Sequence, residues 1–218
     1  GNDFKHETPF TRQYMRRLLK HWLTEYRIDG FRFDLSKGLT QKNSYPNDVS
    51  LWGQYDASRI SILTDYVTEM HTVNPAAYAI MEHFADNSEE QVLASRNMLL
   101  WGNMNGSYNE ATMGWHSGGK SDFSWISWKK RGWNGPNVIG YMESHDEERL
   151  AFKNIMYGNA VMQPYYNIKD TGTSLKRLEL ASVFFFTVPG PKMIWQFGEL
   201  GYDYSINSNG GRLAPKPI

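Results

Sequence analysis

The chain has 218 residues, and its 23 basic residues (Lys and Arg) balance its 23 acidic residues (Asp and Glu). This balance gives no support for nucleic acid or an anionic membrane as a partner. Cysteine is absent, which excludes disulfides, thiolate metal sites and cysteine nucleophiles. No apolar stretch has the length of a membrane span, and the N-terminus carries no signal-peptide pattern. Many secreted bacterial proteins also lack cysteine, and our hypothesis for the location is extracytoplasmic.

The first forty residues predict a helix, a strand and a long loop. Thr8-Pro9 has the pattern of a helix start, with a capping side chain followed by proline in the first turn. Large apolar residues then recur every four positions and have a second row beside them, which together predict one wide apolar face, made of Phe10, Tyr14, Leu18, Trp22 and Tyr26 with Met15, Leu19 and Leu23. A strand is expected to end at Asp34. The loop of roughly twenty residues after it has a length that usually indicates function.

A second helix is expected at about residues 55–71, because apolar residues recur there at helical spacing. A second strand follows at residues 78–82. Ser88 and Gln91 fit a capping box for a short helix that ends near Ser95.

A third strand is expected at residues 98–101 and a fourth at 137–142. Residues 103–136, between them, are rich in Gly, Asn, Ser and Trp. We expect this stretch to be a long loop that most of its tryptophans pack onto the fold. Glu147 and Glu148 suit the first turn of a helix after the fourth strand.

The last part of the sequence predicts a long helix and a fifth strand. Ser174 or Thr173 is expected to cap the helix, and Pro189 to break it. The fifth strand is expected at residues 192–197. The stretch 207–218, rich in Gly, Asn and Pro, is expected to leave the domain.

Three carboxylates follow apolar runs that predict buried strands, and they are Asp34, Glu82 and Asp146. Helical patterns separate these runs, so the chain predicts an α/β fold with a parallel sheet. In such folds the chemistry lies at the carboxyl ends of the strands, where all three acids fall. Acids at one rim suggest general acid/base catalysis, nucleophilic attack on a sugar, or metal binding.

Four segments resemble those of one family of enzymes. They are residues 30–37 (Gly-Phe-Arg-Phe-Asp-Leu-Ser-Lys), Ile80-Met81-Glu82, Ser144-His145-Asp146 and residues 189–199. In this order they are similar to the segments at the fourth, fifth, seventh and eighth strands of the α-amylase family of glycoside hydrolases. The resemblance covers nearly the whole chain. A closed (β/α)8 barrel has about 250 residues and eight βα units, so the chain is expected to be a partial TIM barrel of about five parallel βα units.

The resemblance implies a role for each matching residue. Asp34 would be the nucleophile, Glu82 the general acid/base, and Asp146 the third carboxylate, which stabilises the transition state. Three further residues would contact substrate or the catalytic acids, and they are Arg32 beside Asp34, Lys37 on the leaving-group side, and His145 at the cleaved sugar.

The chemistry of a retaining glycosidase fits these residue types. One ionised carboxylate attacks the anomeric carbon, and a protonated acid about 5 Å away releases the leaving oxygen. Arg32 and Asp34 are two apart on a strand, so their side chains point to the same face, and the cation favours the ionised form of Asp34. Partial burial after an apolar strand is expected to raise the pKa of Glu82 towards that of a proton donor.

The chain also departs from the family pattern. Gly38 stands where the family often has histidine, and Ser144 where it often has asparagine. The family's first three strands, and the segment that supplies a substrate-binding histidine and a calcium-linked asparagine, would lie upstream of Gly1. We therefore expect no cofactor and no metal ligand in this chain, while calcium stays open for the full-length parent.

Two other classes of function use residues of the same types. A metal hydrolase would gather His83 and His145 around the acids, but the spacing His-x-His or His-Glu-x-x-His is missing and Arg32 would repel the ion. A glucan-binding protein without catalysis would typically lack one of the three acids. Within the enzymes, an α-glucan transglycosylase or branching enzyme uses the same acids, and the sequence leaves this alternative open.

The sequence therefore predicts a retaining glycoside hydrolase that acts on α-1,4-linked glucans such as starch and maltooligosaccharides. Residues 1–206 are expected to be the C-terminal part of the catalytic barrel, and residues 207–218 an exit segment towards a downstream domain. The expected partner is an α-glucan. The 218 residues alone are expected to be weak or inactive, and to self-associate through open sheet edges.

Overall fold

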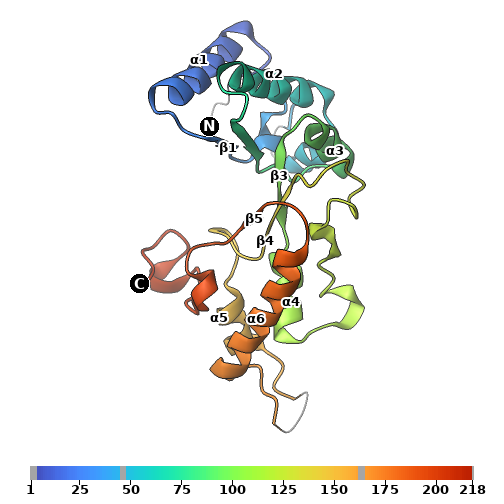
Figure 1. Cartoon of the computed structure of the whole chain (residues 1–218), viewed down its shortest axis with the longest axis vertical. Helices are drawn as coiled ribbons and strands as arrows, with labels where there is room; N and C mark the ends of the chain where they lie inside the picture. Colours follow the sequence, from blue (N-terminus) through green and yellow to red (C-terminus); the bar gives the residue numbers. More distant parts are fainter. Residues whose placement is uncertain (1–3, 45–47, 162–164, 218) are drawn as a thin grey trace. The chain divides into compact units, whose positions relative to one another are not determined.

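The computed structural model describes residues 4–44, 48–161 and 165–217 (Figure 1). Hydrogen bonds join five strands in the order β1-β2-β3-β4-β5. The strands are β1 (Gly30–Phe33), β2 (Tyr78–Met81), β3 (Leu99–Asn103), β4 (Val138–Tyr141) and β5 (Lys192–Met193). The pairs β1–β2, β2–β3 and β4–β5 are parallel. The prediction of an α/β fold with five parallel strands is confirmed.

The chain divides into two compact units, which are described separately. The first unit comprises Gly1–Trp101 and Arg131–Asn137, and the second comprises Gly102–Lys130 and Val138–Ile218.

The first unit contains β1, β2 and three helices, α1 (Pro9–Glu25), α2 (Ala57–Val73) and α3 (Asn87–Ser95). Helix α1 begins where the sequence predicts, because Thr8 accepts a hydrogen bond from the backbone N–H of Thr11. Strands β1 and β2 approach closely at Gly30, where an added Cβ would lie 2.1 Å from the carbonyl oxygen of Tyr78. This register places the ends of the two strands, and the acids that follow them, at one edge of the sheet.

Only part of the wide apolar face predicted for α1 is buried. Phe10 is 82% exposed, and Tyr14, Trp22 and Tyr26 are also exposed. The buried residues of the helix are Leu19 and Leu23, which form the neighbouring four-residue row. A helix with large apolar residues on two adjacent rows has a clear period, but the period does not tell which row packs on α2.

Two helices begin earlier than predicted, and both are capped by aspartate. Asp86 accepts from the backbone N–H of Ser88 at the start of α3, in place of the predicted capping box. Asp170 accepts from the backbone N–H of Thr173 at the start of α6 (Thr171–Thr187). A carboxylate also complements the positive end of the helix dipole, which favours aspartate at this position.

The second unit contains the end of β3, β4, β5 and the helices α4 (Asn105–Met113), α5 (Leu150–Tyr157) and α6. These helices pack on one another (Figure 1). Their core includes Tyr108, which stacks on Phe123 with ring centroids 4.6 Å apart and meets Phe185 edge-on. Helix α4 lies within the stretch that the sequence predicts as loop. Strand β5 has two residues, shorter than the six predicted.

The tryptophans of the predicted loop differ in burial. Trp133 is buried, as expected of a side chain that packs the fold, Trp128 is half-buried, and Trp115 and Trp125 are exposed. In the part of the chain that the structure describes, no helix is long and apolar enough to cross a membrane.

Candidate active site

Asp34 and Glu82 each follow directly the last residue of a parallel strand. The pairing of β1 with β2 extends one step beyond the strands, because the backbone N–H of Glu82 donates to the carbonyl of Phe33 at 3.0 Å. Both carboxylates therefore emerge at the carboxyl edge of the sheet, the edge that carries the chemistry in α/β folds.

Arg32 connects the two acids. Its Nη1 lies 2.9 Å from Oδ1 of Asp34, and its Nη2 lies 2.6 Å from Oε2 of Glu82. The guanidinium lies over the ring of Trp101, 4.3 Å from its centroid. The planar arginine is thus fixed on one face by an aromatic ring and at its edge by two carboxylates. The predicted contact between Arg32 and Asp34 is confirmed.

The two acids have different surroundings. The side chain of Asp34 is 78% exposed, while that of Glu82 is 11% exposed. Burial raises the pKa of Glu82, and the neighbouring carboxylate of Asp34 acts in the same direction. The N–H of Leu35 and the charge of Arg32 oppose this shift without cancelling it. The expectation that burial raises the pKa of Glu82 is confirmed.

A tight turn follows Asp34 and folds back on Glu82. Leu35 adopts a left-handed conformation with φ 40° and ψ 47°, which is unusual for a residue with a side chain. Its N–H donates to Oε2 of Glu82 at 3.3 Å, and the N–H of Ser36 donates to the carbonyl of Glu82 at 2.8 Å. Lys37 donates from Nζ to the carbonyl of Phe84 at 3.3 Å.

The other predicted site residues lie in the second unit. Nε2 of His145 lies 3.4 Å from Oδ2 of Asp146, and the ring of His145 lies against that of Trp195, with centroids 5.7 Å apart. Arg212 donates from Nη1 to Oδ1 of Asp146. A cavity of about 160 Å³ lies beside His145 and is lined by Trp195, Tyr202 and other residues of this unit.

The structure thus brings together Arg32, Asp34 and Glu82 in one unit, and His145 and Asp146 in the other. A common cleft for all three acids stays a prediction. Sequence reasoning missed two contacts of these acids, the N–H of Leu35 and the side chain of Arg212. The first depends on a backbone turn, and the second joins residues 66 positions apart, so neither leaves a local signal.

The two departures from the family pattern have local structural partners. An added Cβ on Gly38 would lie 3.4 Å from the ring of Trp52, an ordinary van der Waals contact, so Gly38 lies against this ring. Ser144 donates from Oγ to Glu147 and accepts from the backbone N–H of Asp146 at 3.1 Å. Ser144 therefore holds the turn that presents Asp146.

Among residues 4–44, 48–161 and 165–217, no three His, Asp or Glu side chains are arranged to hold a metal ion. The three acids are paired with arginines, Asp34 and Glu82 with Arg32 and Asp146 with Arg212.

A family model described as "Alpha amylase, catalytic domain" matches residues 1–212. The chain belongs to the α-amylase family. Curated relatives include the chloroplastic isoamylase SU1 of Zea mays, which is 40% identical over 53 residues, and isoamylase 1 of Arabidopsis thaliana, which is 36% identical over 53 residues. These matches cover 24% of this chain and 7% of each relative.

Solved structures of amylase-type enzymes share the fold. The pullulanase of Anoxybacillus sp. LM18-11, solved with maltotetraose, superposes with a TM-score of 0.66 at 17% identity, over 96% of this chain and 29% of that protein. Amy13B of Eubacterium rectale gives a TM-score of 0.64 at 16% identity, over 93% of this chain and 36% of that protein. The chain therefore spans about a third of these relatives, and the prediction of a partial (β/α) barrel is confirmed.

Proposed function

We propose that the protein is a retaining glycoside hydrolase that acts on α-1,4-linked glucans through a covalent glycosyl-enzyme intermediate. The observation that carries the proposal is the position of Arg32, which binds an exposed Asp34 and a largely buried Glu82 at the same guanidinium. Two carboxylates that bind the same guanidinium lie close together, as the two catalytic carboxyl groups of a retaining glycosidase do, with a separation of about 5–5.5 Å. Their different burial suits one nucleophile and one proton donor.

In the first step, a carboxylate oxygen of Asp34 attacks the anomeric carbon of the sugar. The bond from that carbon to the glycosidic oxygen breaks, and the proton of Glu82 passes to the leaving oxygen. Arg32 binds both acids throughout. Its contact with Asp34 favours the ionised form of the nucleophile.

In the second step, the ionised Glu82 takes a proton from water, and the water oxygen attacks the anomeric carbon. The bond from this carbon to Asp34 breaks, and both acids return to their starting states. A sugar hydroxyl in place of water would give transglycosylation by the same atoms. This is the alternative that the acids alone do not distinguish.

Three further residues would bind the substrate. Asp146 would stabilise positive charge on the reacting sugar, and His145 would donate to a hydroxyl of the cleaved sugar. Lys37 would bind on the leaving-group side. A glucan as partner is supported by the maltotetraose in the similar pullulanase structure.

Product analysis tests the proposal most directly. The full-length protein is incubated with starch, maltooligosaccharides and pullulan, the last because isoamylases and pullulanases are among the relatives. We expect shorter oligosaccharides with the α-anomeric configuration retained in the first product. An inverted first product, or no turnover of any α-glucan, would overturn the proposal. Longer or branched products would favour transglycosylation.

A further inference from the structure

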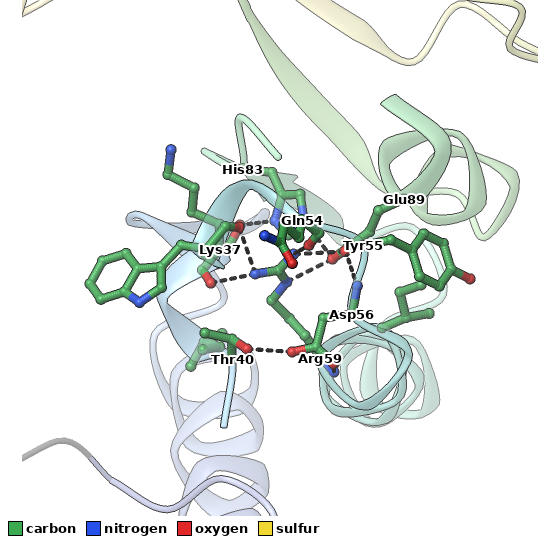
Figure 2. A network of polar contacts seen from close by, with 12 residues as sticks. Lys37, Thr40, Gln54, Tyr55, Asp56, Arg59, His83 and Glu89 are labelled. Carbon is green, nitrogen blue, oxygen red and sulfur yellow. Dashed lines mark hydrogen bonds and ion pairs between the residues drawn. The ribbon is translucent and has the colours of Figure 1, made fainter. Parts of the chain in front are cut away.

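His83, the residue after Glu82, is completely buried and bound at both ring nitrogens (Figure 2). Its Nδ1 lies 2.8 Å from Oγ of Ser36, and its Nε2 lies 2.9 Å from Oε1 of Glu89. The ring therefore joins the turn that follows β1 to the start of α3. Neither the family resemblance nor the proposed mechanism uses this residue.

The charge next to His83 decides which ring nitrogen carries the proton. Burial alone would raise the pKa of Glu89, but hydrogen bonds from His83 and Arg59 outweigh it and lower this pKa to about 2. Burial lowers the pKa of His83, although Glu89 opposes the shift, and Arg59 and Lys37 are the other charges that act on the ring. The imidazole is therefore neutral and donates from Nε2–H to the ionised Glu89, which leaves Nδ1 as an acceptor.

Ser36 receives its orientation from that acceptor. Its hydroxyl proton has two acceptors within reach, Nδ1 of His83 at 2.8 Å and the carbonyl of Glu82 at 3.2 Å, and Nδ1 is the nearer. The backbone N–H of Ser36 donates to the same carbonyl of Glu82 at 2.8 Å. These bonds hold Ser36 directly after Leu35, whose left-handed conformation aims its N–H at the carboxylate of Glu82.

A serine, a histidine and a glutamate in hydrogen-bond contact also form the constellation of hydrolytic triads. Here Ser36 and His83 are both 0% exposed, so no acyl group reaches the hydroxyl. Ser36 is also occupied by the backbone of Glu82. The three residues are therefore a structural support for the neighbouring acid.

We propose that His83 is a positioning residue for Glu82: by holding Ser36 it fixes the left-handed turn that directs the Leu35 N–H onto the Glu82 carboxylate. The inference rests on the proposed role of Glu82 as general acid/base. Because an N–H donor stabilises the ionised carboxylate, release of the turn raises the proton affinity of Glu82. Arg32 and Asp34, the charged groups that face Glu82, are not bound by His83 and keep their contacts.

Two variants of His83 each remove one of the two hydrogen bonds of its ring and keep the other. In His83→Gln the terminal amide replaces Nε2 and keeps the contact with Glu89, while the contact with Ser36 is lost. In His83→Asn the amide replaces Nδ1 and keeps Ser36, while Glu89 is lost. Each variant breaks one buried hydrogen bond, and His83→Asn breaks the stronger one, to the ionised Glu89, so a purely structural role would give His83→Asn the larger effect on the pH profile.

The measurement is the pH profile of kcat/KM on a maltooligosaccharide with the full-length protein. Its alkaline limb reports the general acid of the free enzyme. We expect His83→Gln to move this limb upward by about half a unit to one unit, the effect of one hydrogen bond, and His83→Asn to leave it in place. Ser36→Ala is expected to move the limb as His83→Gln does, with no further shift in the double variant.

If the alkaline limb of the pH profile stays in place in both His83→Gln and Ser36→Ala, the inference is overturned. If His83→Gln does not fold, the pH profile of Ser36→Ala alone decides. Glu82→Gln separates this failure from failure of the proposed function. If the limb survives in Glu82→Gln, the limb does not belong to Glu82, and the assignment of the general acid is wrong. If the limb disappears there but does not respond to His83 or Ser36, only the positioning role is wrong.

Discussion

Arg59 and Glu89 form a two-point ion pair in which both side chains are 0% exposed. Nε of Arg59 lies 2.7 Å from Oε1 of Glu89, and Nη2 lies 2.7 Å from Oε2. The remaining N–H groups of Arg59 donate to backbone carbonyls of the loop after β1, those of Lys37, Trp52 and Gln54 (Figure 2). A single arginine thus attaches this loop to α3.

The first prediction concerns this pair. Glu89→Gln leaves Arg59 charged, buried and without a compensating charge, and such a loss typically costs about 3–5 kcal/mol. For a chain of this size we expect Tm to fall by about 6 °C or more. Thermal unfolding followed by circular dichroism provides the measurement. Glu179→Gln, at an exposed position of α6, is the matched control and is expected to leave Tm unchanged. A Tm loss no greater than that of the control would contradict the importance of the pair.

The sequence predicts the strand ends well because the signal there is local. Each acid follows a short apolar run, and a buried parallel strand needs such a run on both faces. Asp34 and Glu82 therefore fall at the same edge in the structure, as expected. The same reasoning identifies Arg32 as the neighbour of Asp34, since two positions on a strand share one face.

The sequence does not predict features that depend on contacts between residues far apart in the chain. Helix α4 contains Gly and Asn and has a weak apolar period, and its start depends on Asn105, whose amide donates to the carbonyls of Met142 and Glu148. Arg59 and Glu89 are 30 positions apart, and no local pattern pairs them. His83 follows Glu82 directly in the sequence, but its ring binds Ser36 and Glu89, which are 47 and 6 positions away.

The second prediction concerns the nucleophile. Asp34→Asn keeps the volume of the side chain but removes the charge that attacks the anomeric carbon. In the full-length protein we expect kcat to fall by several orders of magnitude, with little change in Tm because the side chain is largely exposed. Hydrolysis of maltooligosaccharides and thermal unfolding are measured on the same samples. Near-normal activity in a well-folded variant would show that another group attacks.

The third prediction concerns the proton donor. Glu82→Gln removes the proton that a poor leaving group needs, so natural glucans should lose most of their turnover. Substrates with good leaving groups require less protonation, and we expect a much smaller loss on an aryl glycoside. The ratio of kcat/KM on the two substrates, compared between the variant and the unchanged protein, measures this difference. Equal losses on both would argue against Glu82 as the acid.

Another buried carboxylate of the first unit, Glu90, provides a prediction on pH. Glu90 pairs with Arg131 at 3.0 Å, and both side chains are 5% exposed. Burial raises the pKa of Glu90 from 4.5 to about 7, although Arg131 and the backbone N–H groups of Phe84 and Ala85 oppose the shift. Between these two values the native state binds a proton that the unfolded state lacks. The contribution of Glu90 to stability is therefore complete below about pH 4.5 and is lost as the pH rises through about 7.

The fourth prediction follows from the direction in which stability changes with pH. Glutamine at this position stays neutral at every pH, so Glu90→Gln should remove the fall in stability that the unchanged protein shows between about pH 5 and pH 8. Thermal unfolding at several pH values within this range measures both curves. The difference in Tm between variant and unchanged protein is expected to grow in favour of the variant as the pH rises, because only the unchanged protein must ionise a buried carboxyl.

Glu25→Gln, at an exposed position at the end of α1, serves as the control, and its Tm should follow the pH curve of the unchanged protein. Parallel curves for Glu90→Gln and the unchanged protein would mean that Arg131 keeps Glu90 ionised throughout this range.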